Sequence, residues 1–323
     1  MSIEIYSNEQ AKQLIKSLVL KNREPHSIVI TGERGQGKKT LAKYISATLL
    51  CESGLGEPCG KCKSCRMLEN GAHPDFITVE SNENGNYQVD VIRSIVSDAV
   101  VKPNENRFKV YLIPDMDRSV NTSVAVQNIL LKLIEEPPAH CIVILTASTK
   151  EFFLETVISR VLCLNTVPCN DEQVREFLLD RCEESELSEA VRFACGNIGR
   201  GIEFLEDASV RVAMDIAKSC AEAIALQNEY DFLRAVFMAD GKKQLFRRVL
   251  ELLAEAFRDA CVLRLGIEKT LGCMPEHSRM LAERYSVAEC ESIYQRCQDY
   301  VSRVDANANS ALTMNSLVSG FFR

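Results

Sequence analysis

The chain has 323 residues, a formal net charge of −7 at pH 7 and an apolar share of 46%. Single hydrophobic cores rarely grow beyond about 250 to 300 residues, so this length predicts two or three domains. The sequence has no run of 18 apolar residues and no leading signal peptide, which argues against a membrane role and favours a cytoplasmic protein. The acidic balance gives no overall attraction to nucleic acid, so such a contact would be local or made through other subunits.

A phosphate-binding loop is predicted near the N-terminus, between an apolar strand and a helix. An amphipathic helix over 8–22 comes first, and 27–31 has the composition of a buried strand. Residues 32–38 then fit the pattern G-x-x-x-x-G-K, in which backbone N–H groups surround phosphate oxygens and the lysine reaches the β- and γ-phosphates. The candidate nucleotide-binding residues are Gly32, Gly35, Gly37 and Lys38.

Both positions expected to bind Mg²⁺ are altered. Lys39 stands where a Ser or Thr hydroxyl is expected, and Thr40 lies one residue further, rotated by about 100° around the helix. After the apolar strand predicted at 110–113, an ATPase would present an Asp for the metal and a Glu for water, but this chain has Pro114 and then Asp115. A solvated turn explains Asp115 at least as well as a catalytic role. We therefore expect ATP binding to be weak or absent.

Four of the fourteen cysteines form a cluster with the spacing C-x7-C-x2-C-x2-C, directly after the helix predicted to follow the loop. Four thiolates suit tetrahedral Zn²⁺, and a C-x-x-C turn lets two sulfur atoms converge on one ion. A redox dithiol or an iron–sulfur cluster could use the same residues, but a short insertion within an α/β domain favours structural zinc. The candidate ligands are Cys51, Cys59, Cys62 and Cys65.

The remaining elements divide the chain into an α/β part and a helical part. Further strands are predicted at 75–79, 142–146 and 161–164, with helices at 89–101 and 121–136 between them. Continuous apolar strands that alternate with helices predict a parallel sheet covered on both faces. Beyond Pro168 the apolar period is helical throughout. Here we expect a helix from a cap at Asp171 through Arg181, one at 186–195, a glycine-rich break at 196–201, and four or five further helices from Ser209 onward.

Together these motifs resemble the AAA+ clamp-loader subunits of bacterial DNA polymerase III. The resemblance covers nearly the whole chain, and its most specific parts are 130–138, which ends in Glu-Glu-Pro-Pro, and the pair Ser159-Arg160. It implies a RecA-like AAA+ α/β domain over 1–167 with a zinc module at 51–65, a helical lid over 168–208 and a helical collar for oligomerisation over 209–323.

In that family the Ser-Arg pair places an arginine finger in the ATP site of a neighbouring subunit. The resemblance therefore implies that Arg160 acts in trans on a neighbour. Because Arg160 comes just before the last strand, we expect it at the edge of the sheet where phosphate-loop folds carry their chemistry. In the motor subunits a helical-lid arginine senses nucleotide, and the resemblance aligns its position with Gly199, next to Arg200.

Departures from the motor subunits favour the delta-prime branch of the family. The gamma/tau subunits keep a hydroxyl after the loop lysine, an Asp-Glu pair after the strand, and Ser-Arg-Cys, where this chain has Lys39, Pro114 and Val161. The resemblance thus implies a subunit of the polymerase holoenzyme without ATPase activity of its own, which supports ATP-dependent loading of the sliding clamp onto primer-template DNA. Its partners would be gamma/tau and delta subunits in a hetero-oligomeric ring.

Two other functions remain open. One is an active ATPase, such as a gamma/tau-like motor with an unusual metal site. The other is a zinc-dependent module that binds nucleic acid, although the acidic balance and the absence of Trp weigh against it. ATP turnover by the isolated chain separates the first function from a non-catalytic subunit, and salt-dependent DNA binding tests the second.

Overall fold

The computed structural model describes residues 5–82, 85–118, 123–306 and 310–322. The chain forms two compact units, Met1–Cys169 and Asn170–Arg323. The division of the second unit into a lid and a collar remains a prediction. Within the described residues, none of the helices combines the length and apolar character that crossing a lipid bilayer requires.

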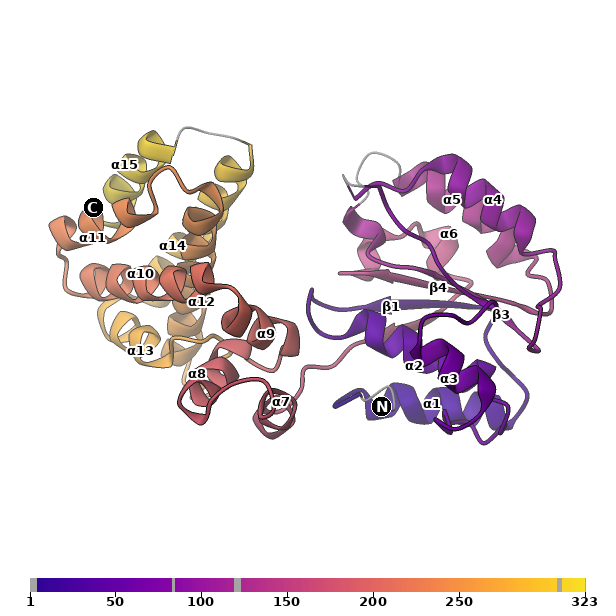
Figure 1. Cartoon of the computed structure of the whole chain (residues 1–323). Coiled ribbons are helices and arrows are strands. Elements are labelled where there is room, and N and C mark those ends of the chain that lie inside the picture. The colour runs from indigo at the N-terminus through magenta and orange to yellow at the C-terminus, as the bar shows by residue number, and fades with distance from the viewer. Residues whose placement is uncertain (1–4, 83–84, 119–122, 307–309, 323) are drawn as a thin grey trace. The chain divides into compact units, whose positions relative to one another are not determined.

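A parallel five-stranded sheet lies at the centre of the described part of the first unit (Figure 1). The strand order is β2-β3-β4-β1-β5, and each neighbouring pair is parallel. The three central strands are buried along their whole length, which confirms the parallel sheet expected from their continuous apolar runs. The strands are β1 (Ser27–Thr31), β2 (Phe76–Thr78), β3 (Lys109–Ile113), β4 (Cys141–Ala147) and β5 (Leu162–Asn165).

Helices cover both faces of this sheet (Figure 1). Successive strand residues point to opposite faces, so Ile28 packs in the core beneath α1, α2 and α3, whereas Val29 packs in the core beneath α4, α5 and α6. The predicted start of α5 at Asn121 lies outside the described residues. The helices are α1 (Glu9–Leu20), α2 (Lys38–Leu50), α3 (Lys63–Glu69), α4 (Val89–Asp98), α5 (Ser123–Glu135) and α6 (Glu155–Ile158), with short 3₁₀ turns η1 (Met116–Arg118) and η2 (Lys150–Phe152).

The described part of the second unit is helical, as the apolar period predicted. Six α-helices follow residue 207 among the described residues, so the expectation of four or five was too low. The helices are α7 (Asp171–Leu178), α8 (Glu184–Ala194), α9 (Ile198–Glu206), α10 (Ala208–Ala225), α11 (Glu229–Val236), α12 (Lys243–Arg264), α13 (Pro275–Arg284), α14 (Val287–Asp305) and α15 (Ser310–Phe321), with a 3₁₀ turn η3 (Phe237–Ala239).

Several predicted helix boundaries in this unit are wrong. The helix predicted to run through Arg181 ends at Leu178, and the one predicted at 186–195 spans Glu184–Ala194. The cap of α7 is Asn170 rather than Asp171, because the Asn170 side chain accepts a hydrogen bond from the backbone N–H of Gln173, whose side chain bonds back to the Asn170 N–H. The glycine-rich break ends earlier than expected, since α9 already begins at Ile198. Gly201 lies inside α9, where an added Cβ would come within 2.9 Å of Leu178 Cδ1. This glycine allows close helix packing and does not interrupt the helix.

Candidate phosphate loop, metal cluster and arginine

The glycine loop connects the carboxyl end of β1 to the first residue of α2. Gly35 and Gly37 have φ angles of +89° and +78°, in the left-handed region that favours glycine. Gly32 is required for another reason: a Cβ there would lie 1.8 Å from Thr166 Oγ1, which follows β5. The predicted residues Gly32, Gly35, Gly37 and Lys38 therefore lie in one tight loop at the start of a helix. Nucleotide binding there remains a prediction.

Lys38 is folded back over this loop and is almost fully buried. Its ammonium donates hydrogen bonds of 2.6 Å to the Gly32 carbonyl and 3.0 Å to the Glu33 carbonyl. Burial lowers the pKa of Lys38, and the carboxylates of Asp115 and Asp117 oppose that shift. Phosphate oxygens could replace the two carbonyl partners, since both kinds of group accept hydrogen bonds from an ammonium.

Lys39, at one of the two positions expected to bind Mg²⁺, forms an ion pair. The Nζ atom of Lys39 lies 2.8 Å from Oδ2 of Asp115. Asp115 has a φ of +51°, and its backbone N–H donates a 2.8 Å hydrogen bond to Oγ1 of Thr146 in β4. Pro114 contributes only its carbonyl, which accepts a hydrogen bond from the Tyr87 hydroxyl. These residues do not fit a magnesium ion, because one expected ligand is a cation and another carries no carboxylate.

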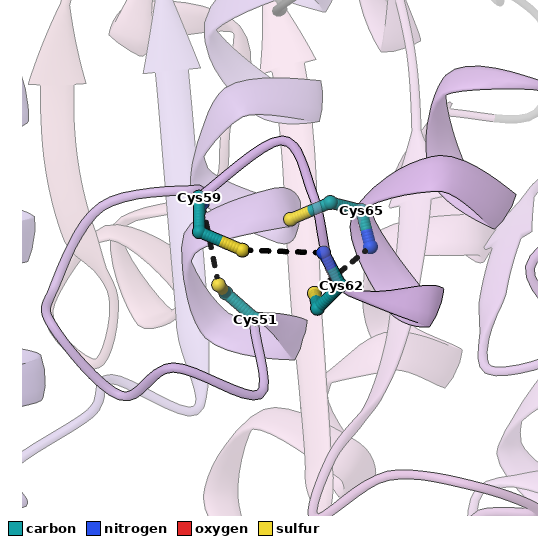
Figure 2. A group of neighbouring side chains, drawn as sticks. All are labelled: Cys51, Cys59, Cys62 and Cys65. Atoms are coloured by element: carbon teal, nitrogen blue, oxygen red, sulfur yellow. Dashed lines mark hydrogen bonds between the residues drawn. The ribbon is translucent and has the colours of Figure 1, made fainter.

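The four predicted cysteine ligands come together in space (Figure 2). Cys51 follows α2, Cys59 lies in the connecting loop, Cys62 caps α3 and Cys65 lies in its first turn. Their sulfur atoms all lie within 4.8 Å of one another. The sulfur atoms of a tetrahedral Zn²⁺ site with bonds of about 2.3 Å are roughly 3.8 Å apart, so this group could close on a metal ion with small movements.

Backbone N–H groups point at the sulfur atoms of the cluster (Figure 2). The N–H groups of Cys59, Cys62 and Cys65 lie 3.4 Å from the sulfur atoms of Cys51, Cys59 and Cys62 respectively. The backbone N–H groups of Lys61 and Cys62 lower the pKa of Cys59 to about 6. Burial raises the pKa of Cys65, and a bound divalent ion would reverse that shift because it binds the thiolate. The donor set therefore fits a structural metal ion, and zinc is the proposal developed below.

A polar network that the sequence analysis missed ties this cysteine module to the sheet. Glu52 accepts hydrogen bonds of 3.1 Å from both the backbone N–H and the hydroxyl of Ser64, at the start of α3. The side chain of Asn106 donates a 2.8 Å hydrogen bond to the Ser64 hydroxyl and lies 2.9 Å from Nε2 of His73. Lys63 and Glu105 form an ion pair of 2.7 Å beside it. The module is thus held by the loop that precedes β3.

Arg160 lies at the opposite edge of the sheet from the one we predicted. It precedes β5, whose first residue, Leu162, pairs with Ile28 near the start of β1, whereas the phosphate loop follows the end of β1. The two edges are separated by the five residues of β1, or about 16 Å at 3.3 Å per residue. Arg160 therefore lies far from the phosphate loop of its own unit.

The surroundings of Arg160 form an open polar hollow of about 680 Å³, whose lining includes His26, Ser27, Glu135 and Glu136. The guanidinium donates hydrogen bonds to the Thr156 carbonyl (3.0 Å) and the Ser159 hydroxyl (2.9 Å). Its Nε lies 3.2 Å from Glu135 Oε1, and 44% of the side chain remains exposed. The end of Arg160 is thus oriented by the preceding helix α6 and by Glu135 of α5, yet it remains accessible to another molecule.

Arg200, the residue next to the predicted sensor position, is engaged within the second unit. It forms two hydrogen bonds, of 2.7 and 3.0 Å, with the carboxylate of Glu255 in α12. The guanidinium also lies 5.1 Å from the centre of the Phe193 ring. A bidentate pair of this kind fixes α9 against α12, which is a structural role.

Comparison with known proteins identifies the family. The model described as "DNA polymerase III, delta subunit" matches residues 7–169, half of the chain. The chain belongs to this family of clamp-loader subunits. It is 31% identical over 232 residues to the DNA polymerase III subunit gamma of Buchnera aphidicola subsp. Schizaphis graminum, which covers 68% of this chain and 62% of that protein.

Two further relatives belong to different subunit types. The tau subunit of Bacillus subtilis is 32% identical over 158 residues, covering 49% of this chain and 27% of that protein. The delta' subunit of the same organism is 23% identical over 268 residues, covering 80% of this chain and 78% of that protein. The chain spans between 27% and 62% of the length of the gamma and tau relatives named here.

Proposed function

We propose that this chain is a non-catalytic, delta-prime-like subunit of the DNA polymerase III clamp loader. In this role it supports ATP-dependent loading of the sliding clamp onto primed DNA in the cytoplasm, together with gamma/tau and delta subunits. The observation that carries the proposal is the 2.8 Å ion pair between Lys39 and Asp115. Each ligand that Mg²⁺ loses removes part of the charge compensation between the β- and γ-phosphates, so hydrolysis at this loop should be negligible.

The position of Arg160 supports a role toward a neighbour. The side chain is exposed and lies at the edge of the sheet away from its own phosphate loop. A guanidinium keeps its charge at any relevant pH, and its planar fork can contact two phosphate oxygens. Such a group, supplied in trans, accelerates phosphoryl transfer by about 10³- to 10⁵-fold. We therefore assign Arg160 as an arginine finger for an adjacent ATPase subunit.

A structural Zn²⁺ on Cys51, Cys59, Cys62 and Cys65 completes the proposal. The donors would hold the ion while the network of Glu52, Ser64 and Asn106 fixes the module on the sheet. Thiolate ligands without an open position suit a structural ion rather than a catalytic one.

Reconstitution with candidate gamma/tau and delta subunits tests this function. The chain should copurify with them, and ATP turnover stimulated by clamp and primed DNA should require it. The isolated chain should hydrolyse ATP at or near background. Robust turnover by the isolated chain that disappears in Lys38→Ala would instead support the alternative, a catalytically active gamma/tau-like motor.

A further inference from the structure

The Lys39–Asp115 pair places a fixed cation beside the phosphate loop. Lys39 is the second residue of α2, and Asp115 follows β3, so both lie at the carboxyl edge of the sheet together with Lys38. The Lys39 side chain is 54% exposed and that of Asp115 is 19% exposed. The ammonium is therefore paired with a largely buried carboxylate, while about half of the Lys39 side chain remains accessible.

The surrounding charges leave a net positive centre. Arg118 reaches to 3.9 Å from the same oxygen of Asp115, and Asp117 accepts a 2.8 Å hydrogen bond from the backbone N–H of Ser148. Three cations (Lys38, Lys39 and Arg118) thus face two carboxylates (Asp115 and Asp117), and the helix end adds partial positive charge.

We propose that this loop binds the polyphosphate of a nucleoside di- or triphosphate without a divalent metal ion, with the Lys39 ammonium in the place of Mg²⁺. In a magnesium-dependent loop, a carboxylate and a hydroxyl hold the ion that compensates the phosphates. Here the carboxylate of Asp115 holds an ammonium instead. An ammonium has three N–H donors, two more than the bond to Asp115 needs, and these can reach phosphate oxygens.

A divalent ion would gain little at this position. It would have to share the Asp115 oxygen with a cation that already lies 2.8 Å from it, and like charges at such distances repel strongly. Lys38 and the left-handed glycines remain as in a functional loop, so phosphate contacts do not depend on the metal. The inference rests on the proposed function only in treating the loop as one that does not turn over ATP. It departs from the expectation of weak or absent ATP binding, because that expectation considered only binding that depends on Mg²⁺.

Titration of the full chain with ATP and with ADP, in EDTA and in excess Mg²⁺, tests the proposal. Calorimetry should detect binding of at least one nucleotide in EDTA, and Mg²⁺ should leave the affinity unchanged or weaken it. Lys39→Thr, which restores the hydroxyl, should weaken binding in EDTA by about tenfold, the loss expected for one charge-assisted phosphate contact. That variant should also become sensitive to Mg²⁺. The matched control is Lys43→Thr, an exposed lysine of the same helix, which should bind like the wild type.

Binding that requires Mg²⁺ in the wild type, or no binding of either nucleotide in EDTA, would overturn the inference. The wild-type comparison needs no variant, so a folding defect in Lys39→Thr cannot obscure the result. Failure here is distinct from failure of the proposed function. A chain that binds no nucleotide but still assembles with gamma/tau and delta and supports their ATP turnover would refute metal-free binding alone.

Discussion

The carboxylate of Asp75 accepts a 3.1 Å hydrogen bond from the backbone N–H of Asn106. The same carboxylate accepts hydrogen bonds from the backbone N–H groups of Asn104 (2.6 Å) and Glu105 (2.9 Å). Because Asn106 also contacts Ser64 of the cysteine module, one buried side chain shapes the loop on which the module rests.

Replacing Asp75 should change how the free energy of unfolding depends on pH. Burial on its own would raise the pKa of Asp75, but the three backbone donors outweigh it and hold the pKa below its ordinary value. A carboxyl group whose folded-state pKa is lowered contributes stability above its unfolded pKa, near 3.9, and loses it as the pH falls through the folded-state pKa. Asp75→Asn replaces one accepting oxygen with an NH₂ group, which cannot accept hydrogen bonds from these N–H groups. The substitution should lower the unfolding free energy by about 1 to 3 kcal/mol at pH 7.

Urea unfolding followed by circular dichroism measures this difference at pH 7 and again at pH 3, where it should shrink. Asp90→Asn is the control, because Asp90 is an exposed residue of α4 whose side chain is paired only with Arg93 among the described ion pairs. That variant should stay within about 0.5 kcal/mol of the wild type. A deficit in Asp75→Asn that is equal at both pH values would contradict the electrostatic explanation.

Metal analysis tests the cysteine cluster. We expect about one Zn per chain, and Cys62→Ser should lower the metal content sharply and reduce the melting temperature of the first unit, because metal binding energy is folding energy. Cys163→Ser, at an exposed cysteine of β5, should keep its zinc. Equal zinc content in the wild type and Cys62→Ser would rule out the assignment of this ligand.

Gly201→Ala should destabilise the second unit although alanine favours helices. The new Cβ would lie 2.9 Å from Leu178 Cδ1 and 3.3 Å from the Ala194 Cβ, so the buried Leu178 side chain must change position and α8 must shift by a few tenths of an ångström. Overpacking of this kind costs about 1 to 3 kcal/mol. Gly199→Ala, at a partly exposed position of the same helix, should be neutral or stabilising. Thermal unfolding of both variants is the measurement. A Gly201→Ala protein as stable as the wild type would show that the surrounding side chains and helices accommodate the added Cβ without cost.

The sheet was predictable from sequence because central strands such as β4 are apolar without interruption. Such strands are stable when helices cover both faces of the sheet. The Lys39–Asp115 pair was not, since it depends on the left-handed turn at Asp115, which no periodicity reveals. The Asp75 network joins side chains to backbone groups about 30 residues away and leaves no local signal.

The error in placing Arg160 had a different origin. In a parallel sheet, a residue before a strand and a residue after a strand lie at opposite edges, so the order of Arg160 and β5 already implied the correct edge. The predicted edge is correct for a segment that follows a strand, such as the loop after β1, and not for Arg160, which precedes β5. The observed position of Arg160 favours a role in trans more strongly than the predicted position did.

We expect Arg160 to act in the ATP site of a neighbouring subunit. The test of this role is the rate of ATP hydrolysis, stimulated by clamp and primed DNA, in a complex reconstituted with Arg160→Ala. The site facing Arg160 should lose about 10³- to 10⁵-fold in rate, so the rate of the complex should fall while its assembly persists. Arg93→Ala, at an exposed arginine of α4, should leave the rate unchanged. An undiminished rate in an intact Arg160→Ala complex would rule out a role for Arg160 in a neighbour's ATP site.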